Sequence, residues 1–121
     1  MPAEMALDVR TKRAHDPPEA SDGCRVLIDH VWPRGIKREE LSLDEWAREL
    51  APSDELRRWF GHDPERFDEF RARYRDELSS HGDKLEELRR RARDGAVTVV
   101  YAARDREHNN AAVLAELLHD A

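Results

Sequence analysis

Two polar turns, each directly after an apolar run, hold most of the side chains that could carry chemistry. The first is DHVWPRG (29–35) and the second is RDREHNN (104–110). In open α/β sheets, ligands bind beyond the carboxyl ends of the strands. A helix that begins there also offers free N–H groups to an anion. If both turns lie at the same edge of a sheet, one cleft would receive the side chains of Asp29, Arg34, Arg104 and His108.

In the first turn, Arg34 lies between Pro33 and Gly35 and could hold a carboxylate or phosphate through two parallel hydrogen bonds. The alternative is an ion pair with Asp29 or another acid. Asp29 could act as a general base or orient Arg34, although an acid at a strand end also commonly fixes a loop. Trp32 could form a pocket wall or belong to the core. We take Asp29 as a catalytic candidate and Trp32, Arg34 and Gly35 as ligand-binding candidates.

In the second turn, His108 is the other catalytic candidate, because an imidazole can change charge near neutral pH and move protons. The alternative is that His108 caps the last helix. Arg104 and Asn109 complete the ligand-binding candidates. Asparagine is common in turns and caps, and Arg104 would be exposed or paired if no cleft forms.

Other kinds of site have weaker support in the sequence. The six histidines lack the paired spacing of a zinc helix or finger, so no metal site is predicted. Cys24 opens an apolar run, where a thiol is more often packed than nucleophilic. The five glycines form no phosphate-binding loop. The residues identify no cofactor.

Length and composition limit the class of protein. A chain of 121 residues fits a single domain over residues 1–121. With 27 acidic against 21 basic residues and a net charge of −6, nucleic-acid binding is disfavoured. The longest apolar stretch, residues 96–103, is too short to span a membrane. A single cysteine and the lack of a secretory pattern suggest a cytoplasmic protein.

Hydrophobic patterns predict an α/β fold in a single small domain. Strands are expected at 7–11, 24–29 and 97–102, the last a continuous apolar run typical of parallel sheets covered on both faces. The capping box Ser42-Leu43-Asp44-Glu45 predicts a helix to about Leu50. Further helices are expected before Gly61, after Asp63-Pro64, from about Asp83, and at the carboxyl end. The predicted architecture is a mostly parallel sheet of at least three strands flanked by helices.

Three segments, RVLIDHVWPRGIKREEL, LAPSDELRRWFGHDPERFDEFRARY and VTVVYAARDREHNNAAVLAELL, resemble the YeaO-like branch of the domain of unknown function 488 family. The resemblance runs in order from about Leu7 to Leu118. It implies a small bacterial or archaeal cytoplasmic α/β domain and no particular reaction. The family usually has DR where this chain has Asp29-His30, which weakens any mechanism that needs a second arginine there. Its signature positions here are Asp29, Trp32, Pro33, Arg34, Gly35, Gly61, His62, Asp63, Asp105, His108 and Asn109.

Two functional hypotheses follow. The first is a ligand-binding or enzymatic domain whose cleft takes a small anionic ligand between the WPRG and ARDxxHN turns. The second is a non-enzymatic module built on Trp46, Trp59 and Phe60 that binds a protein partner or associates with itself; self-association would give a homo-oligomer. Metal binding and DNA binding are more distant alternatives.

Overall fold

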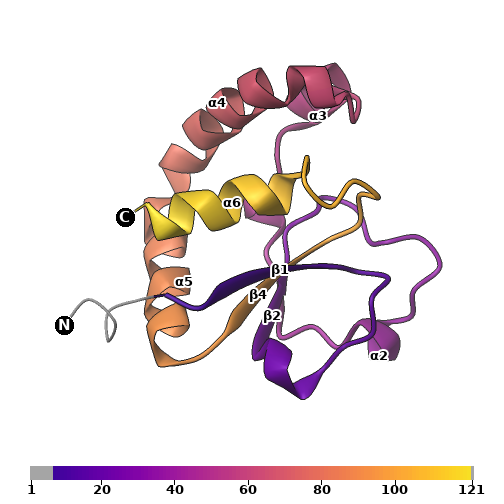
Figure 1. Ribbon diagram of the computed structural model, residues 1–121, viewed down its shortest axis with the longest axis vertical. Helices are drawn as coiled ribbons and strands as arrows, with labels where there is room; N and C mark the ends of the chain where they lie inside the picture. Colours follow the sequence, from indigo (N-terminus) through magenta and orange to yellow (C-terminus); the bar gives the residue numbers. More distant parts are fainter. Residues whose placement is uncertain (1–6, 121) are drawn as a thin grey trace.

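The computed structural model describes residues 7–120 and contains a four-stranded sheet (Figure 1). Its strands are β1 (Val9–Arg13), β2 (Cys24–Leu27), β3 (Glu45–Trp46) and β4 (Val97–Tyr101), in the order β1-β4-β2-β3. Every neighbouring pair is parallel. The sequence prediction of a single α/β architecture with a mostly parallel sheet is therefore confirmed, with β3 as an additional short edge strand.

Strand β4 lies between β1 and β2 and is buried along its whole length. Its side chains alternate between two cores, as the period of a strand requires. Val97, Val99 and Tyr101 belong to the larger core, and Val100 belongs to a smaller one. The continuous apolar run thus has the environment that the sequence predicted for it.

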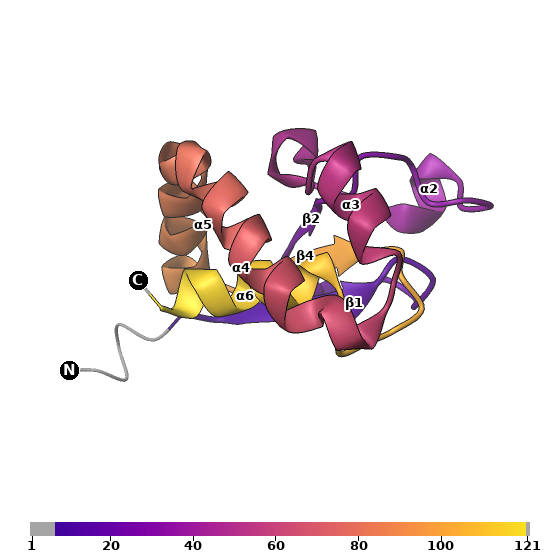
Figure 2. The same ribbon diagram turned by 90° about the horizontal axis from the view of Figure 1, so that it is seen from above.

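The larger core is covered by α3 (Asp54–Phe60), α4 (Phe67–Leu78), α5 (Gly82–Asp94) and α6 (Asn110–His119). In Figure 1, α3, α4 and α5 form an arc around α6, which packs against β1, β4 and α4. The predicted stripe of Phe67, Phe70, Tyr74 and Leu78 is buried on the inner face of α4. The smaller core lies under the segment that contains α2 (Arg38–Leu41), seen far from α5 in Figure 2.

The capping box at Ser42 does not start a helix, so that prediction was wrong. Ser42 instead follows the last residue of α2 and adopts a left-handed conformation with φ of 50°. The backbone N–H groups of Asp44 and Ala47 donate to the carbonyls of Arg25 (2.9 Å) and Leu27 (2.8 Å). Pairing with β2 therefore satisfies the groups that a helix would have used. Only the 3₁₀ turn Arg48–Leu50 remains of the predicted helix.

Three further short 3₁₀ segments complete the described chain: Ala20–Asp22, Pro64–Arg66 and Ser79–His81. Asp63 caps the second of these, and its side chain accepts a hydrogen bond from the N–H of Glu65. Ser53 caps α3 through the N–H of Leu56. The start at Asp63 and the end of α3 before Gly61 agree with the sequence prediction. Strand β1 begins two residues later than predicted, and β2 ends two residues earlier.

Candidate functional site

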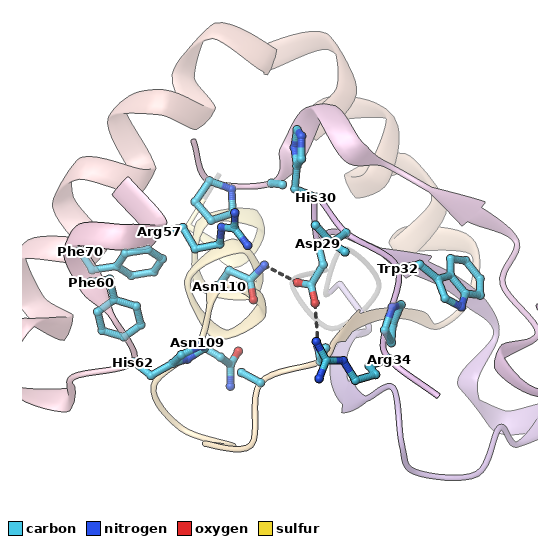
Figure 3. A pocket seen from close by; sticks show the side chains of 16 residues that line it. Asp29, His30, Trp32, Arg34, Arg57, Phe60, His62, Phe70, Asn109 and Asn110 are labelled. Carbon is cyan, nitrogen blue, oxygen red and sulfur yellow. Dashed lines mark hydrogen bonds between the residues drawn. The ribbon is translucent and has the colours of Figure 1, made fainter. Parts of the chain in front are cut away.

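The two polar turns lie together at the carboxyl edge of the sheet. Strands β2 and β4 are parallel neighbours, so the residues that follow them leave the sheet side by side. A pocket of about 280 Å³ opens between these turns and the α3–α4 region (Figure 3). Its sixteen lining residues are Asp29, His30, Val31, Trp32, Pro33, Arg34, Ala51, Pro52, Arg57, Phe60, His62, Phe70, Ala102, Ala103, Asn109 and Asn110.

Asp29 joins the two turns through both carboxylate oxygens. Its Oδ2 accepts a hydrogen bond from the backbone N–H of Ala102 at 2.8 Å, and its Oδ1 accepts one from Asn110 Nδ2 at 2.9 Å. The carbonyl of Asp29 accepts a third from Trp46 Nε1 at 2.7 Å. Within residues 7–120 no ion pair reaches this carboxylate, so the alternative pairing with Arg34 is not formed. Asp29 therefore fixes loops and also faces the pocket.

The environment of Asp29 makes its carboxyl a weaker acid than an exposed aspartate. Burial raises the pKa of this carboxyl above its ordinary value. Hydrogen bonds from Asn110 and Ala102 and the charges of Arg57 and His62 oppose that rise without cancelling it. An unpaired carboxylate in a partly dry pocket is costly, which distinguishes Asp29 from the surface acids of this chain.

The rest of the first turn forms one wall of the pocket. Trp32 is half-buried, donates from Nε1 to the carbonyl of Ile36 at 2.6 Å, and meets the Trp46 ring edge-to-face at 5.3 Å. Arg34 lines the pocket and is exposed, with no hydrogen bond or ion pair among the described residues. Gly35 has φ of 79° and makes the turn after Arg34 without lining the pocket. Trp32 thus takes part in both the wall and the smaller core.

In the second turn, Asn109 lines the pocket and caps α6. Its Oδ1 accepts a hydrogen bond from the N–H of Ala112, and its Nδ2 donates to the carbonyl of Asp105, both at 2.8 Å. His108 is not the cap, and it does not line the pocket. Its Nδ1 lies 2.9 Å from Asp105 Oδ2, and its ring meets Phe67 edge-on at 5.1 Å. Arg104 is exposed and also lies outside the lining.

The remaining wall comes from α3 and α4, and sequence reasoning missed most of it. Arg57, Phe60 and Phe70 line the pocket, and none was predicted to line it; Phe60 was considered only for an interaction surface. His62, at φ of 57°, was noted only as a family signature and a remote metal candidate. A signal for Arg57 existed: it lies three residues before the buried Phe60, and such residues share a helix face.

The donors present limit the chemistry of the pocket. The lining contains no serine, threonine, tyrosine, cysteine or lysine among the residues that the structure describes. Asp29 is the one carboxylate in that lining. In residues 7–120, no cluster of three or more histidine, cysteine, aspartate or glutamate side chains could hold a metal ion. None of the helices in this range is long and apolar enough to cross a membrane.

Comparison with known proteins gives a consistent set of relatives. The chain is 41% identical to the uncharacterised protein YeaO of Escherichia coli, over 93% of this chain and 97% of the relative. It is 44% identical to uncharacterised proteins of Mycobacterium tuberculosis and Mycobacterium bovis, over 92% of this chain and 93% of each relative. No solved structure matches. A family profile described as "Inactive DUF488-N3 subclade" matches residues 8–121, and the chain therefore belongs to the DUF488 family, as the sequence motifs suggested.

Proposed function

We propose that this protein is a binding domain for a small anionic ligand, held in the pocket between the two turns. The observation that carries the proposal is that two guanidinium groups, Arg34 and Arg57, line one small pocket from different elements. In Figure 3, the pair formed by Asp29 and Asn110 lies between Arg57 on one side and Arg34 on the other. Arginine suits carboxylates and phosphates because its fork of N–H donors matches their geometry.

Helix α6 adds a second source of positive potential. Its cap Asn109 and first residue Asn110 both line the pocket. The N-terminus of a ten-residue helix carries partial positive charge and N–H groups without helical partners. An anion between Arg34 and Arg57 would benefit from this field.

Binding without catalysis fits the lining better than an enzyme does. Covalent catalysis needs an activated nucleophile, and the described lining offers neither a hydroxyl nor a thiol. Acid–base catalysis by Asp29 with His108 would need both at one ligand, and His108 lies outside the lining. The two histidines that do line the pocket, His30 and His62, are exposed and form no hydrogen bond with Asp29. The description of the matched subclade as inactive supports the same view.

The interaction-module hypothesis has less support. Phe60 is buried, and Trp46 and Trp59 are half-buried. Within residues 7–120, Val31 is the one large hydrophobic side chain with high exposure, at 59%. A single exposed valine is well short of the contiguous apolar patch that marks a partner surface.

Isothermal titration with inorganic phosphate, acetate and benzoate tests the proposal. We expect at least one of these anions to bind wild-type protein, and Arg34→Gln/Arg57→Gln to reduce its affinity at least tenfold. Arg58→Gln is the matched control, because Arg58 is a neighbouring exposed residue of α3 outside the pocket lining. Unchanged affinity in the double variant, or an equal loss in Arg58→Gln, would contradict anion binding at this pocket.

A further inference from the structure

The pocket lining carries both negative and positive charge, and this limits which anions can bind. Asp29 contributes a negative charge beside Asn110 and Ala102, while Arg34 and Arg57 contribute positive charge. Arg57 also pairs through Nη2 with Asp54 at 3.0 Å, which leaves its Nε and Nη1 for a ligand. Arg57 is close enough for its charge to act on the Asp29 carboxyl. An anionic group placed against Asp29 would be repelled, so it must lie on the arginine side. The part of the ligand that faces Asp29 must then be a hydrogen-bond donor or a cation.

Asp29 has acceptor capacity left for such a group. A carboxylate has about four acceptor positions, and Ala102 and Asn110 fill two of them. No ion pair within residues 7–120 supplies a cation to Asp29. A half-buried carboxylate that lines a cavity and has no direct ion pair is stabilised when a ligand supplies one.

Between these charged ends the pocket is apolar. Phe60 and Phe70 stack with ring centroids 4.3 Å apart, and both are nearly fully buried. Pro33 and Pro52, also buried, and Ala51 and Ala103 line the pocket beside them. A volume of about 280 Å³ lies just below the roughly 300–1,000 Å³ of typical ligand pockets. The apolar part of the ligand is therefore small.

We propose that the ligand is a small amino carboxylate with an apolar side chain, its ammonium group on Asp29 and its carboxylate on Arg57 and Arg34. This inference rests on the proposed function, since it takes the arginines as the anion site. It adds the requirement that the ligand also carry a cationic group and a small apolar side chain. A lone metal cation is a poorer occupant, because Asp29 is the single carboxylate of the described lining.

Two series of matched probes test the ammonium and carboxylate groups of the ligand separately while the apolar group stays the same. The first series is L-phenylalanine, 3-phenylpropionate and 2-phenylethylamine. The second is L-leucine, 4-methylpentanoate and 3-methylbutylamine. In wild-type protein we expect the amino acid of at least one series to bind at least tenfold more tightly than its carboxylate and its amine, as measured by titration calorimetry and by chemical shifts of the Ala102 and Asn110 amides.

Variants assign each charge to a side chain. Asp29→Asn keeps a carbonyl for the Ala102 N–H and is expected to remove the tenfold advantage of the amino acid over its carboxylate. Arg57→Gln is expected to remove the tenfold advantage of the amino acid over its amine. Arg58→Gln should change neither the advantage over the carboxylate nor the advantage over the amine. A cooperative thermal unfolding transition shows that each variant is folded. If a variant fails to fold, the comparison of the three probes on wild-type protein still tests the inference.

The outcomes distinguish this inference from the proposed function. If the simple carboxylates bind as tightly as the amino acids and still need the arginines, the inference is wrong and anion binding stands. If no probe of either series binds at 10 mM (roughly −2.7 kcal/mol of affinity or weaker), the inference is also wrong. Phosphate, acetate and benzoate then decide separately whether the pocket binds anions.

Discussion

Asp29 and Asn110 are 81 residues apart in the chain, yet their side chains meet at 2.9 Å, where Asn110 Nδ2 donates to Asp29 Oδ1. The same Nδ2 also donates to the carbonyl of Ile28 at 3.2 Å. One amide therefore ties the first turn of α6 to the end of β2 and leaves the carboxylate facing the pocket.

Exchanging the two groups tests this contact. Asn110→Asp places two carboxylates together and is expected to lower the free energy of unfolding by about 1–3 kcal/mol. The double variant Asp29→Asn/Asn110→Asp restores a donor and an acceptor, so it should recover at least half of that loss. Urea unfolding of the wild type, both single variants and the double variant gives the coupling between the sites. Additive effects would show that the contact contributes nothing.

The raised pKa of Asp29 predicts a specific pH dependence. Because its pKa is higher in the folded than in the unfolded chain, the native state keeps a proton that the unfolded state has already lost. The contribution of Asp29 to stability therefore falls as pH rises above about 4, the ordinary aspartate pKa, through the raised folded value. Asp29→Asn should become more stable relative to wild type between pH 4 and pH 7. Parallel stability curves for the two proteins would contradict this.

The buried pair of Asp22 and Arg25 is expected to matter most for stability. Arg25 Nη1 donates to Asp22 Oδ2 at 2.7 Å, and both side chains are less than 10% exposed. Lys12 also contacts the same carboxylate at 3.1 Å. Asp22→Ala leaves Arg25 without its counter-charge and should cost about 3–5 kcal/mol in urea unfolding.

Asp16→Ala is the comparison for that variant, because Asp16 pairs with the exposed Arg106 at the surface. Removing a surface ion pair should cost about 1 kcal/mol or less. Equal losses in the two variants would show that the Asp22 network is not a stabilising feature.

Gly23 is expected to tolerate no side chain. It has φ of 65°, and a Cβ there would lie 2.3 Å from the carbonyl oxygen of Ala96. Gly23→Ala should therefore lower the melting temperature by several degrees or prevent folding. Gly82→Ala, in open space within α5, should leave the melting temperature unchanged or raise it. A tolerated Gly23→Ala would mean that the Asp22–Cys24 backbone can move away from Ala96.

Local patterns in the sequence were sufficient for the elements with strong periodicity. Strand β4 followed from a continuous apolar run, and α4 from aromatic residues at three- and four-residue steps. Strand β3 and α2 were missed because two and four residues carry no detectable period. The capping box at Ser42 was misread because its N–H groups had partners on β2, which a local motif does not reveal.

The candidate site was only partly predictable for a related reason. In a parallel sheet the carboxyl ends of β2 and β4 lie at the same edge, and this followed from fold class. That β2 and β4 are neighbours depends on the strand order, which the sequence left open. Arg57 and Phe70 lie there because α3 and α4 pack over that edge, and this placement depends on tertiary contacts. His108 contacts Asp105 and Phe67 and therefore lies outside the pocket lining. The sequence around His108 does not indicate these contacts.

The strand order has a consequence for how the protein is made. Because β4 lies between β1 and β2, β1 has no strand to pair with, and β1 and β2 are not joined in one sheet, until residues 97–101 have been synthesised. A nascent chain that ends before β4 lacks the four-stranded sheet, and it also lacks Ala102, Asn109 and Asn110 of the pocket. Such non-local pairing slows folding. The ribosome must therefore release the chain through β4 and the first turn of α6 before the native strand order and this pocket can form.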